Sequence, residues 1–167
     1  LFKVFTEYGE EKYAKKIAAQ ICLERKAKPI STTKELENII FHCYPRDLRH
    51  GKTNPSTRVF QGLRWEVNRE LEVLTDTITH LIPLLKMGGR LAVISFHSLE
   101  DRIVKNLFKE ASESLELPVH ILTKKPIVPT EEEILNNSRS RSAKLRVLER
   151  IEVKKDKNKY KKDFRQE

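Results

Sequence analysis

A group of polar and ionisable side chains follows the most apolar strand-like segment of the chain. Residues 90–96 are nearly continuous apolar sequence with β-branched side chains, and directly after them come His97, Ser98, Glu100 and Asp101. An apolar run of this kind is typical of a strand covered on both faces, as in a parallel α/β sheet. Sheets of that class bind ligands at the carboxyl ends of their strands. We therefore expect the chemistry of this chain at that point.

The same polar residues stand where a helix is predicted to begin. Residues 99–114 carry apolar side chains at helical spacing, and Gly88 and Gly89 permit a helix-to-strand turn with positive φ before the strand. Ser98 and the acidic pair can cap this helix and balance its dipole, and this alternative stays open. A hydrolase that uses His97 and Ser98 is disfavoured, because neighbouring side chains point apart while a nucleophile and its base must be within hydrogen-bond reach.

Length and composition favour a nucleic-acid partner. The 167 residues suffice for about one domain with its own core, and 33 Lys and Arg against 24 Asp and Glu give a formal net charge of +9. A basic chain suits a polyanion, and nucleic acid is the first expectation. A basic protein with a solvated lysine surface remains the alternative, since composition shows no patch.

The two cysteines and the lack of long apolar runs indicate where in the cell the protein is expected. Cys22 and Cys43 lie on apolar helical stripes without metal-ligand spacing, so we expect reduced core residues in a cytoplasmic protein and no metal site. No apolar run approaches the length of a membrane span, and no signal peptide is visible. The chain starts inside an apolar pattern without an initiator Met, and it looks cut from something longer.

Patterning divides the chain into an all-helical part and an α/β part. Apolar spacing predicts a helix over residues 9–26 and a second one that begins with a capping box of Thr32 and Glu35 and ends at Tyr44. The further predicted elements are a polar loop at residues 46–56, one long helix or two joined helices over residues 57–82, strands at 118–123 and 144–153, and a disordered basic tail at 154–167.

Two groups of basic residues are candidates for RNA contact. Within residues 57–82 the apolar stripe includes Phe60, Leu63 and Val67, whereas another face carries Arg58, Gln61, Trp65 and Asn68 with Arg64 beside them. Such a face can pair with phosphates and stack on a base, although a solvated surface is the alternative. Near the C-terminus, Arg139 and Arg141 alternate with serines, a pattern that can hold phosphates or form a flexible linker.

Three segments, in chain order, resemble the bacterial 16S ribosomal RNA cytosine-N4 methyltransferases, the RsmH or MraW family. They are RVFQGLRWEVNRELEVL at residues 58–74, GGRLAVISFHSLEDRIVK at 88–105 and NSRSRSAKLRVLER at 137–150. YGEEKYAKKIA at residues 8–18 is also similar to the inserted helical domain of that family. The resemblance spans roughly residues 5–150 and is to the C-terminal half of the family.

The resemblance implies an α/β fold, namely part of the Rossmann-like sheet of a class I S-adenosylmethionine-dependent methyltransferase with an all-helical domain inserted into it. Residues 1–56, with a possible extension to about 68, are then part of the inserted domain, and residues 57–153 are the C-terminal part of the methyltransferase domain. In that fold residues 90–95 form the fifth strand, and the two later strands form an antiparallel edge. The implied reaction is methyl transfer from S-adenosylmethionine to the N4 amino group of a cytosine in 16S ribosomal RNA, free or within the small ribosomal subunit.

By resemblance and by position, the residues expected to wall the cytosine pocket are Ser95, His97, Ser98 and Glu100. Asp101 is expected to be structural, paired with Arg102 or capping the helix. The candidates for RNA phosphates are Arg58, Arg64, Arg139 and Arg141, and Trp65 either stacks on a base or lies in the core.

This sequence departs from the family pattern in two respects. The family's glycine-rich loop, its acidic ribose-binding residue and its Asp-Leu-Gly segment are absent, so the cofactor-binding residues are expected outside this chain, which alone is expected to be inactive. The family commonly has Pro where Ser138 stands, which implies a looser turn before Arg139. A non-catalytic RNA-binding module descended from such an enzyme is the alternative function, and both a monomer and a homodimer are compatible with the sequence.

Overall fold

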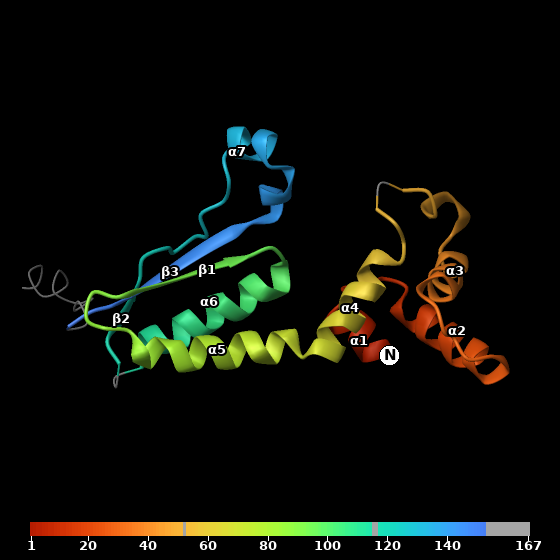
Figure 1. The fold of residues 1–167 in the computed structure, drawn as a ribbon, viewed down its shortest axis with the longest axis horizontal. Coiled ribbons are helices and arrows are strands. Elements are labelled where there is room, and N and C mark those ends of the chain that lie inside the picture. The colour runs from red at the N-terminus through yellow and green to blue at the C-terminus, as the bar shows by residue number, and fades with distance from the viewer. Residues whose placement is uncertain (52, 115–116, 153–167) are drawn as a thin grey trace, which may run out of the picture. The chain divides into compact units, whose positions relative to one another are not determined.

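The structure, a computed structural model, describes residues 1–51, 53–114 and 117–152. The chain separates into two compact units, Leu1–Glu70 and Leu71–Glu167. Figure 1 shows helices in the first unit and a small sheet with helices in the second. The predicted basic tail at residues 154–167 lies outside the described residues. No helix within the described ranges is long and apolar enough to cross a membrane.

The regular secondary structure described in the first unit is all helical. Its elements are α1 (Phe2–Glu7), α2 (Ala14–Ala27), α3 (Thr33–Cys43), a 3-10 turn (Arg46–Leu48) and α4 (Thr57–Asn68). All four α-helices contribute to its core, which consists of Phe5, Ala14, Ile17, Ala18, Ile21, Ile40, Cys43 and Val59. Both cysteines are free thiols as predicted, with Cys43 buried and Cys22 half-buried.

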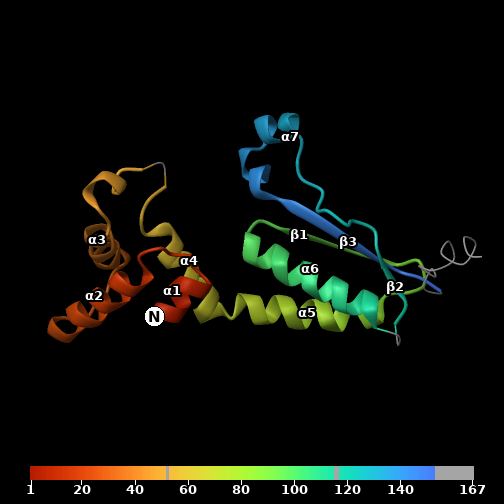
Figure 2. The same ribbon diagram turned by 180° about the vertical axis from the view of Figure 1, so that it is seen from behind.

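The second unit contains, among its described residues, a three-stranded antiparallel sheet. Its elements are α5 (Glu70–Leu84), β1 (Arg90–Ser95), α6 (Ser98–Glu113), β2 (Val119–Ile121), α7 (Glu131–Asn136), a 3-10 segment (Ser138–Ser142) and β3 (Lys144–Arg150). The strand order is β1-β3-β2. Both views place α5 and α6 on the same side of the sheet (Figures 1 and 2). The core between them consists of Ile78, Ile82, Val104, Phe108, Val119 and Leu148.

The start of α3 agrees with the sequence, whereas the start of α2 does not. The Thr32 hydroxyl accepts a hydrogen bond from the Glu35 backbone N–H at 3.2 Å, and the Glu35 carboxylate accepts one from the Thr32 N–H at 3.0 Å. α2 begins at Ala14 rather than near residue 9, because the preceding residues form a turn in which Glu10 has a φ of 47°. The buried Glu11 carboxylate holds this turn to the end of α3 by accepting a 2.6 Å hydrogen bond from the Tyr44 hydroxyl.

The predicted helical run over residues 57–82 consists of the two helices α4 and α5. The break is at Arg69, which has a φ of 53°. The predicted apolar stripe is only partly confirmed for α4, because Leu63 packs against the core, whereas Val67 is 77% exposed and the fully buried residues include Gly62 and Trp65. A Cβ atom at Gly62 would lie 3.1 Å from the carbonyl oxygen of Val4. The contact with α1 therefore uses the glycine face of α4, which periodicity of large apolar residues does not reveal.

β1 is a strand as predicted, but its surroundings differ from the prediction. It pairs antiparallel with β3 at one edge of the sheet, and alternate residues are exposed, including Ile94 at 58%. The expectation of a parallel sheet with both faces of this strand covered is therefore wrong for the described residues. An apolar run identifies a strand but encodes neither the direction of its partner nor what covers its second face. The antiparallel arrangement of the two later strands is confirmed, as is the positive φ of Gly88, at 74°.

Candidate functional site

The turn between β1 and α6 is stabilised by hydrogen bonds in which His97 takes part. His97 is the N-cap residue of α6, and its Nδ1 accepts a hydrogen bond from the Leu99 backbone N–H at 3.3 Å. Because a backbone N–H must donate here, Nδ1 carries a lone pair in this geometry. Nδ1 of His97 is therefore used by the cap.

Glu100 completes a capping box at the same turn. Its Oε2 accepts hydrogen bonds from the backbone N–H groups of Phe96 at 3.0 Å and His97 at 3.1 Å. The alternative that these polar residues cap α6 is thus confirmed for Glu100, while the N-cap residue is His97 rather than Ser98. Ser98 is the first residue of the helix and is exposed, and Ser95, at the end of β1, is buried.

Asp101 ties the first turn of α6 to the central strand of the sheet. Its carboxylate binds Arg146 of β3 through two hydrogen bonds, Nε to Oδ1 at 2.7 Å and Nη2 to Oδ2 at 3.2 Å. The Lys144 ammonium lies 3.6 Å from Oδ2. The hydrogen bond from Arg146 keeps the pKa of Asp101 below its usual value. Asp101 is therefore structural as expected, but these partners in β3 were not identified from the sequence.

The serine- and arginine-rich segment lies at the same end of the sheet as this turn. Ser95, the last residue of β1, is paired with Lys144, the first residue of β3, and the 3-10 segment directly precedes β3. Ser140 is buried, and its hydroxyl donates to the Asn137 carbonyl at 2.8 Å. Arg139 and Arg141 on either side of it are exposed. The structure thus brings both arginines to the sheet end that carries His97.

The three candidates on α4 belong to the first unit, and they differ in exposure. Arg58 is exposed and donates to the Glu10 carbonyl at 3.2 Å. Arg64 is exposed and forms a two-pronged ion pair with Glu70, with distances of 3.0 and 3.1 Å. Trp65 is 2% exposed, so its ring lies in the interior and no base can stack on it without rearrangement. Of the two alternatives for Trp65, the structure favours the core.

Two sets of polar residues were missed from the sequence. Arg146 belongs to the charged set of the predicted half-buried strand at residues 144–153, yet it shares the buried face of β3 with Leu148. Its two-residue spacing from a core leucine was the available signal. The loop at residues 46–56 was read as a connection only, although it forms a cavity against α3 with Phe41. An aromatic residue beside a polar loop gives no specific signal in sequence.

Comparison with known proteins connects this geometry to a family. A sequence profile described as the MraW methylase family matches residues 1–151. The ribosomal RNA small subunit methyltransferase H of Sulfurihydrogenibium sp. (strain YO3AOP1) is 55% identical over 151 residues, which are 90% of this chain and 51% of that protein. The proteins of the same name from Persephonella marina and Caldicellulosiruptor saccharolyticus are 53% and 52% identical, with 90% of this chain and 51% and 53% of those proteins covered. The chain spans about half the length of the curated relatives it matches.

Proposed function

Because the chain belongs to the MraW methylase family, we propose that it is part of an enzyme that transfers a methyl group from S-adenosylmethionine to the N4 amino group of a cytosine in 16S ribosomal RNA. The match of residues 1–151 to a methylase family carries this proposal. The printed names of the relatives support ribosomal RNA of the small subunit as the substrate. The assignment of the cytosine N4 amino group as the methylated group is supported by the resemblance of residues 88–105 to enzymes with that specificity.

The second unit is proposed to be one end of a larger Rossmann-like methyltransferase sheet, and the first unit to be part of a helical domain inserted into it. Among the described strands, β1 pairs along one edge only. Ile94 is exposed on its outer face, and Phe96 beyond it is 56% exposed. Exposed apolar side chains beside an open strand edge favour contact with further protein. The additional length of the relatives is the proposed source of that protein.

The described residues do not fit the cofactor. A methyltransferase of this class needs an acidic side chain for the ribose hydroxyls of its cofactor. Glu100 uses its carboxylate to cap α6, and Asp101 binds Arg146. Both oxygens of Asp101 are thus engaged, and Glu100 has one oxygen outside its capping bonds, whereas two neighbouring ribose hydroxyls need both oxygens of a carboxylate. We therefore assign S-adenosylmethionine to residues outside this chain and derive no step from its binding here.

The turn after β1 is proposed to hold the cytosine. Methylation of an amino group requires that the N4 lone pair is aimed at the methyl group and that an acceptor takes the leaving proton. The Glu100 carboxylate is fixed by two backbone N–H groups, so its other oxygen can accept from the N4 amino group without further ordering. Nε2 of His97 and the hydroxyl of the exposed Ser98 are proposed to contact the remaining polar edge of the base. Ser95 is buried, so its proposed contact with the base requires a rearrangement of the turn.

Exposed arginines are proposed to hold the RNA backbone. Arg139 and Arg141 lie at the end of the sheet that carries the cytosine turn, so they can bind phosphates next to the target nucleotide. Arg58 and Arg64 are candidates for phosphates contacted by the first unit. Arg64 is the weaker of these two, because a phosphate must compete with Glu70 for its guanidinium.

A chimeric enzyme tests the proposal. Residues 1–151 replace the matching residues of the Sulfurihydrogenibium relative, which is 55% identical, and small-subunit RNA is incubated with the chimera and S-adenosylmethionine. Nucleoside mass spectrometry is expected to detect N4-methylcytidine at a level comparable with that of the parent relative. A folded chimera that binds RNA but yields no methylated nucleoside would instead favour the non-catalytic RNA-binding module.

The isolated chain tests the assignment of the cofactor. Calorimetric titration of the 167-residue chain with S-adenosylmethionine is expected to give no binding heat. Clear micromolar binding would place a cofactor site within these residues and would contradict the assignment.

A further inference from the structure

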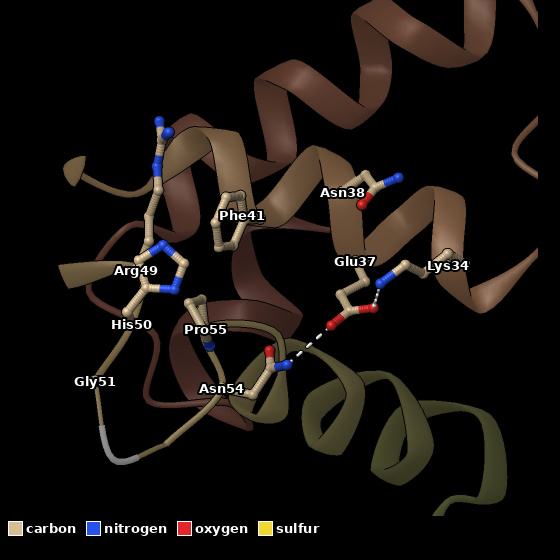
Figure 3. A pocket seen from close by; sticks show the side chains of 9 residues that line it. All are labelled: Lys34, Glu37, Asn38, Phe41, Arg49, His50, Gly51, Asn54 and Pro55. Atoms are coloured by element: carbon tan, nitrogen blue, oxygen red, sulfur yellow. Dashed lines mark hydrogen bonds and ion pairs between the residues drawn. The ribbon is translucent and has the colours of Figure 1, made fainter. Parts of the chain in front are cut away.

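A cavity of about 510 Å³ lies in the first unit between α3 and the loop that follows it. Figure 3 shows its walls. On one side are the rings of Phe41, His50 and Pro55, and on the other are the polar side chains of Lys34, Glu37, Asn38 and Asn54. The cavity combines flat apolar surfaces with hydrogen-bonding groups, and no residue proposed for methyl transfer lines it.

The loop side of this cavity is held in place at both of its ends. Arg49 donates to the carbonyl oxygens of Tyr44 at 3.0 Å and His42 at 3.3 Å, at the end of α3. Asn54 donates to Glu37 on α3 at 2.9 Å. These bonds fix the loop against the helix before any ligand arrives. A cavity that is formed in advance binds a ligand with a smaller loss of conformational entropy.

The ring side can stack on a flat ligand. The Phe41 and His50 rings meet edge to face with centroids 5.5 Å apart, and the Arg49 guanidinium lies 5.2 Å from the Phe41 centroid. Aromatic rings and a neighbouring arginine are the groups on which proteins stack unpaired bases. The exposed Lys34 at the rim is paired with Glu37 at 2.8 Å, and its ammonium has two further N–H donors that can reach a phosphate.

The polar side distinguishes between two kinds of anionic partner. The Glu37 carboxylate is held by Lys34 at 2.8 Å and by Asn54, and these bonds lower its pKa, so it stays charged. An acidic peptide would bring its carboxylates against this charge. A nucleobase is neutral, and its amino group can donate to a carboxylate, while the Asn38 amide can donate to or accept from its edge.

We propose that this cavity binds one unpaired nucleotide of single-stranded RNA, with its base against Phe41 and His50 and its phosphate near Lys34. The site lies wholly within residues 34–55 of the first unit. The proposal rests on the proposed RNA substrate and deepens it, because it adds a second point at which the chain recognises that RNA.

Fluorescence anisotropy with the 167-residue chain and a short labelled single-stranded RNA tests the site. Phe41→Leu keeps an apolar side chain but removes the aromatic face, and it is expected to weaken binding about fivefold or more, since stacking on one base has roughly this effect. The matched control is Phe2→Leu, which changes a 54% exposed phenylalanine of α1 and is expected to bind as the unchanged chain does. Lys34→Gln is expected to weaken binding, with Lys26→Gln on α2 as its control.

Photocrosslinking provides a readout that needs no variant. RNA containing 4-thiouridine is irradiated with the unchanged chain, and the crosslinked peptides are expected to include those that carry Phe41 and His50, besides any from the other proposed RNA contacts. Equal affinities of Phe41→Leu and Phe2→Leu, with no crosslink in the peptides that carry the cavity residues, would overturn the site. The methylation assay with the chimera tests the proposed function separately. An unchanged chain that binds no RNA would also overturn it. Displacement of the RNA by polyglutamate, with Lys34→Gln weakened and Phe41→Leu unaffected, would mark a peptide site instead.

Discussion

Two helices of this chain begin with the same hydrogen-bonding arrangement but with different residues. At α3 the N-cap residue is Thr32 and the returning carboxylate is Glu35, while at α6 these positions hold His97 and Glu100. The capping bonds have similar lengths, 3.2 Å to the threonine hydroxyl and 3.3 Å to the imidazole. Threonine is a preferred N-cap residue and histidine is not. Helix stability explains the first cap, whereas the histidine at the second is explained only by the proposed contact of its imidazole with the base.

The two caps also differ in what supports them. Glu35 forms an ion pair with the exposed Lys28 at 2.9 Å, close by in the sequence. Next to Glu100, Asp101 binds Arg146 in a strand distant in the sequence, and both side chains are largely buried. The α3 cap is thus a local feature, while the α6 turn is fixed to the sheet. A turn that must position reacting groups needs such support from outside its own helix.

The largest expected effect is on stability and follows from removing the Asp101 carboxylate that binds Arg146. Asp101→Ala leaves the Arg146 guanidinium buried without its carboxylate, and the free energy of unfolding is expected to fall by about 3 kcal/mol. Urea denaturation of the 167-residue chain measures it. The pKa of Asp101 is lower in the folded chain than its usual value of 3.8, so its contribution is present above that value and is lost as the pH falls through the folded pKa. The variant should therefore lose less stability than the unchanged chain on acidification.

The exposed pair of Arg64 and Glu70 provides the control for this measurement. Its geometry is similar, but the Arg64 side chain is mostly in solvent. Glu70→Ala is expected to change the free energy of unfolding by about 0–1 kcal/mol. Equal losses for Asp101→Ala and Glu70→Ala would mean that the α6 turn is anchored no more firmly than a surface pair.

The next prediction separates the capping role of His97 from its proposed role in methyl transfer. His97→Asn replaces the imidazole by a side chain that caps helices well, so the chain should keep its stability. In the chimeric enzyme the same change is expected to lower the methylation rate about tenfold or more, because the group proposed to contact the base is lost. Thr32→Asn makes the corresponding exchange at α3 and should leave both stability and rate unchanged. Full methylation by the His97→Asn chimera would remove the distinction between the two caps.

The same contrast shows what the sequence could predict. The Thr32 capping box is local, since four consecutive residues contain the whole signal, and its helix was predicted correctly. The His97 box has the same spacing, but histidine is not expected as a cap, so capping was sought at Ser98. The partner of Asp101 lies 45 residues away, and no local pattern links it to Arg146. Pairs of this kind are determined by strand register, which depends on the whole sheet.

The sequence also could not predict what packs against the faces of β1 and α4. Residues 90–96 are apolar enough for a strand buried on both sides, yet Ile94 is exposed among the described residues. The composition of a strand reflects everything that covers it, and the chain spans about half the length of the curated relatives it matches. In α4 the lack of a side chain at Gly62 permits the close approach to α1, so a periodicity of large residues identified Leu63 but not the glycine side of the buried face.

The smallest expected effect is a change in the pKa of Glu35, which belongs to the α3 cap alone. The pKa of Glu35 is lowered from 4.5 to about 2, first by the hydrogen bond from Lys28 and then by those from the Ser31 and Thr32 backbones. Lys28→Gln should therefore raise the pKa while leaving it below 4.5, because the two backbone donors remain. A pH titration followed by NMR of the carboxyl carbon measures it, with Lys12→Gln as a control.

The direction of this effect fixes its pH range. Since the folded pKa of Glu35 is lowered, the stabilisation by its carboxylate is present above pH 4.5 and is lost as the pH falls towards about 2. An unchanged pKa in Lys28→Gln would show that the exposed ion pair is not populated in solution. The α3 cap would then depend on backbone donors alone, and the contrast with the buried support of the α6 turn would become sharper.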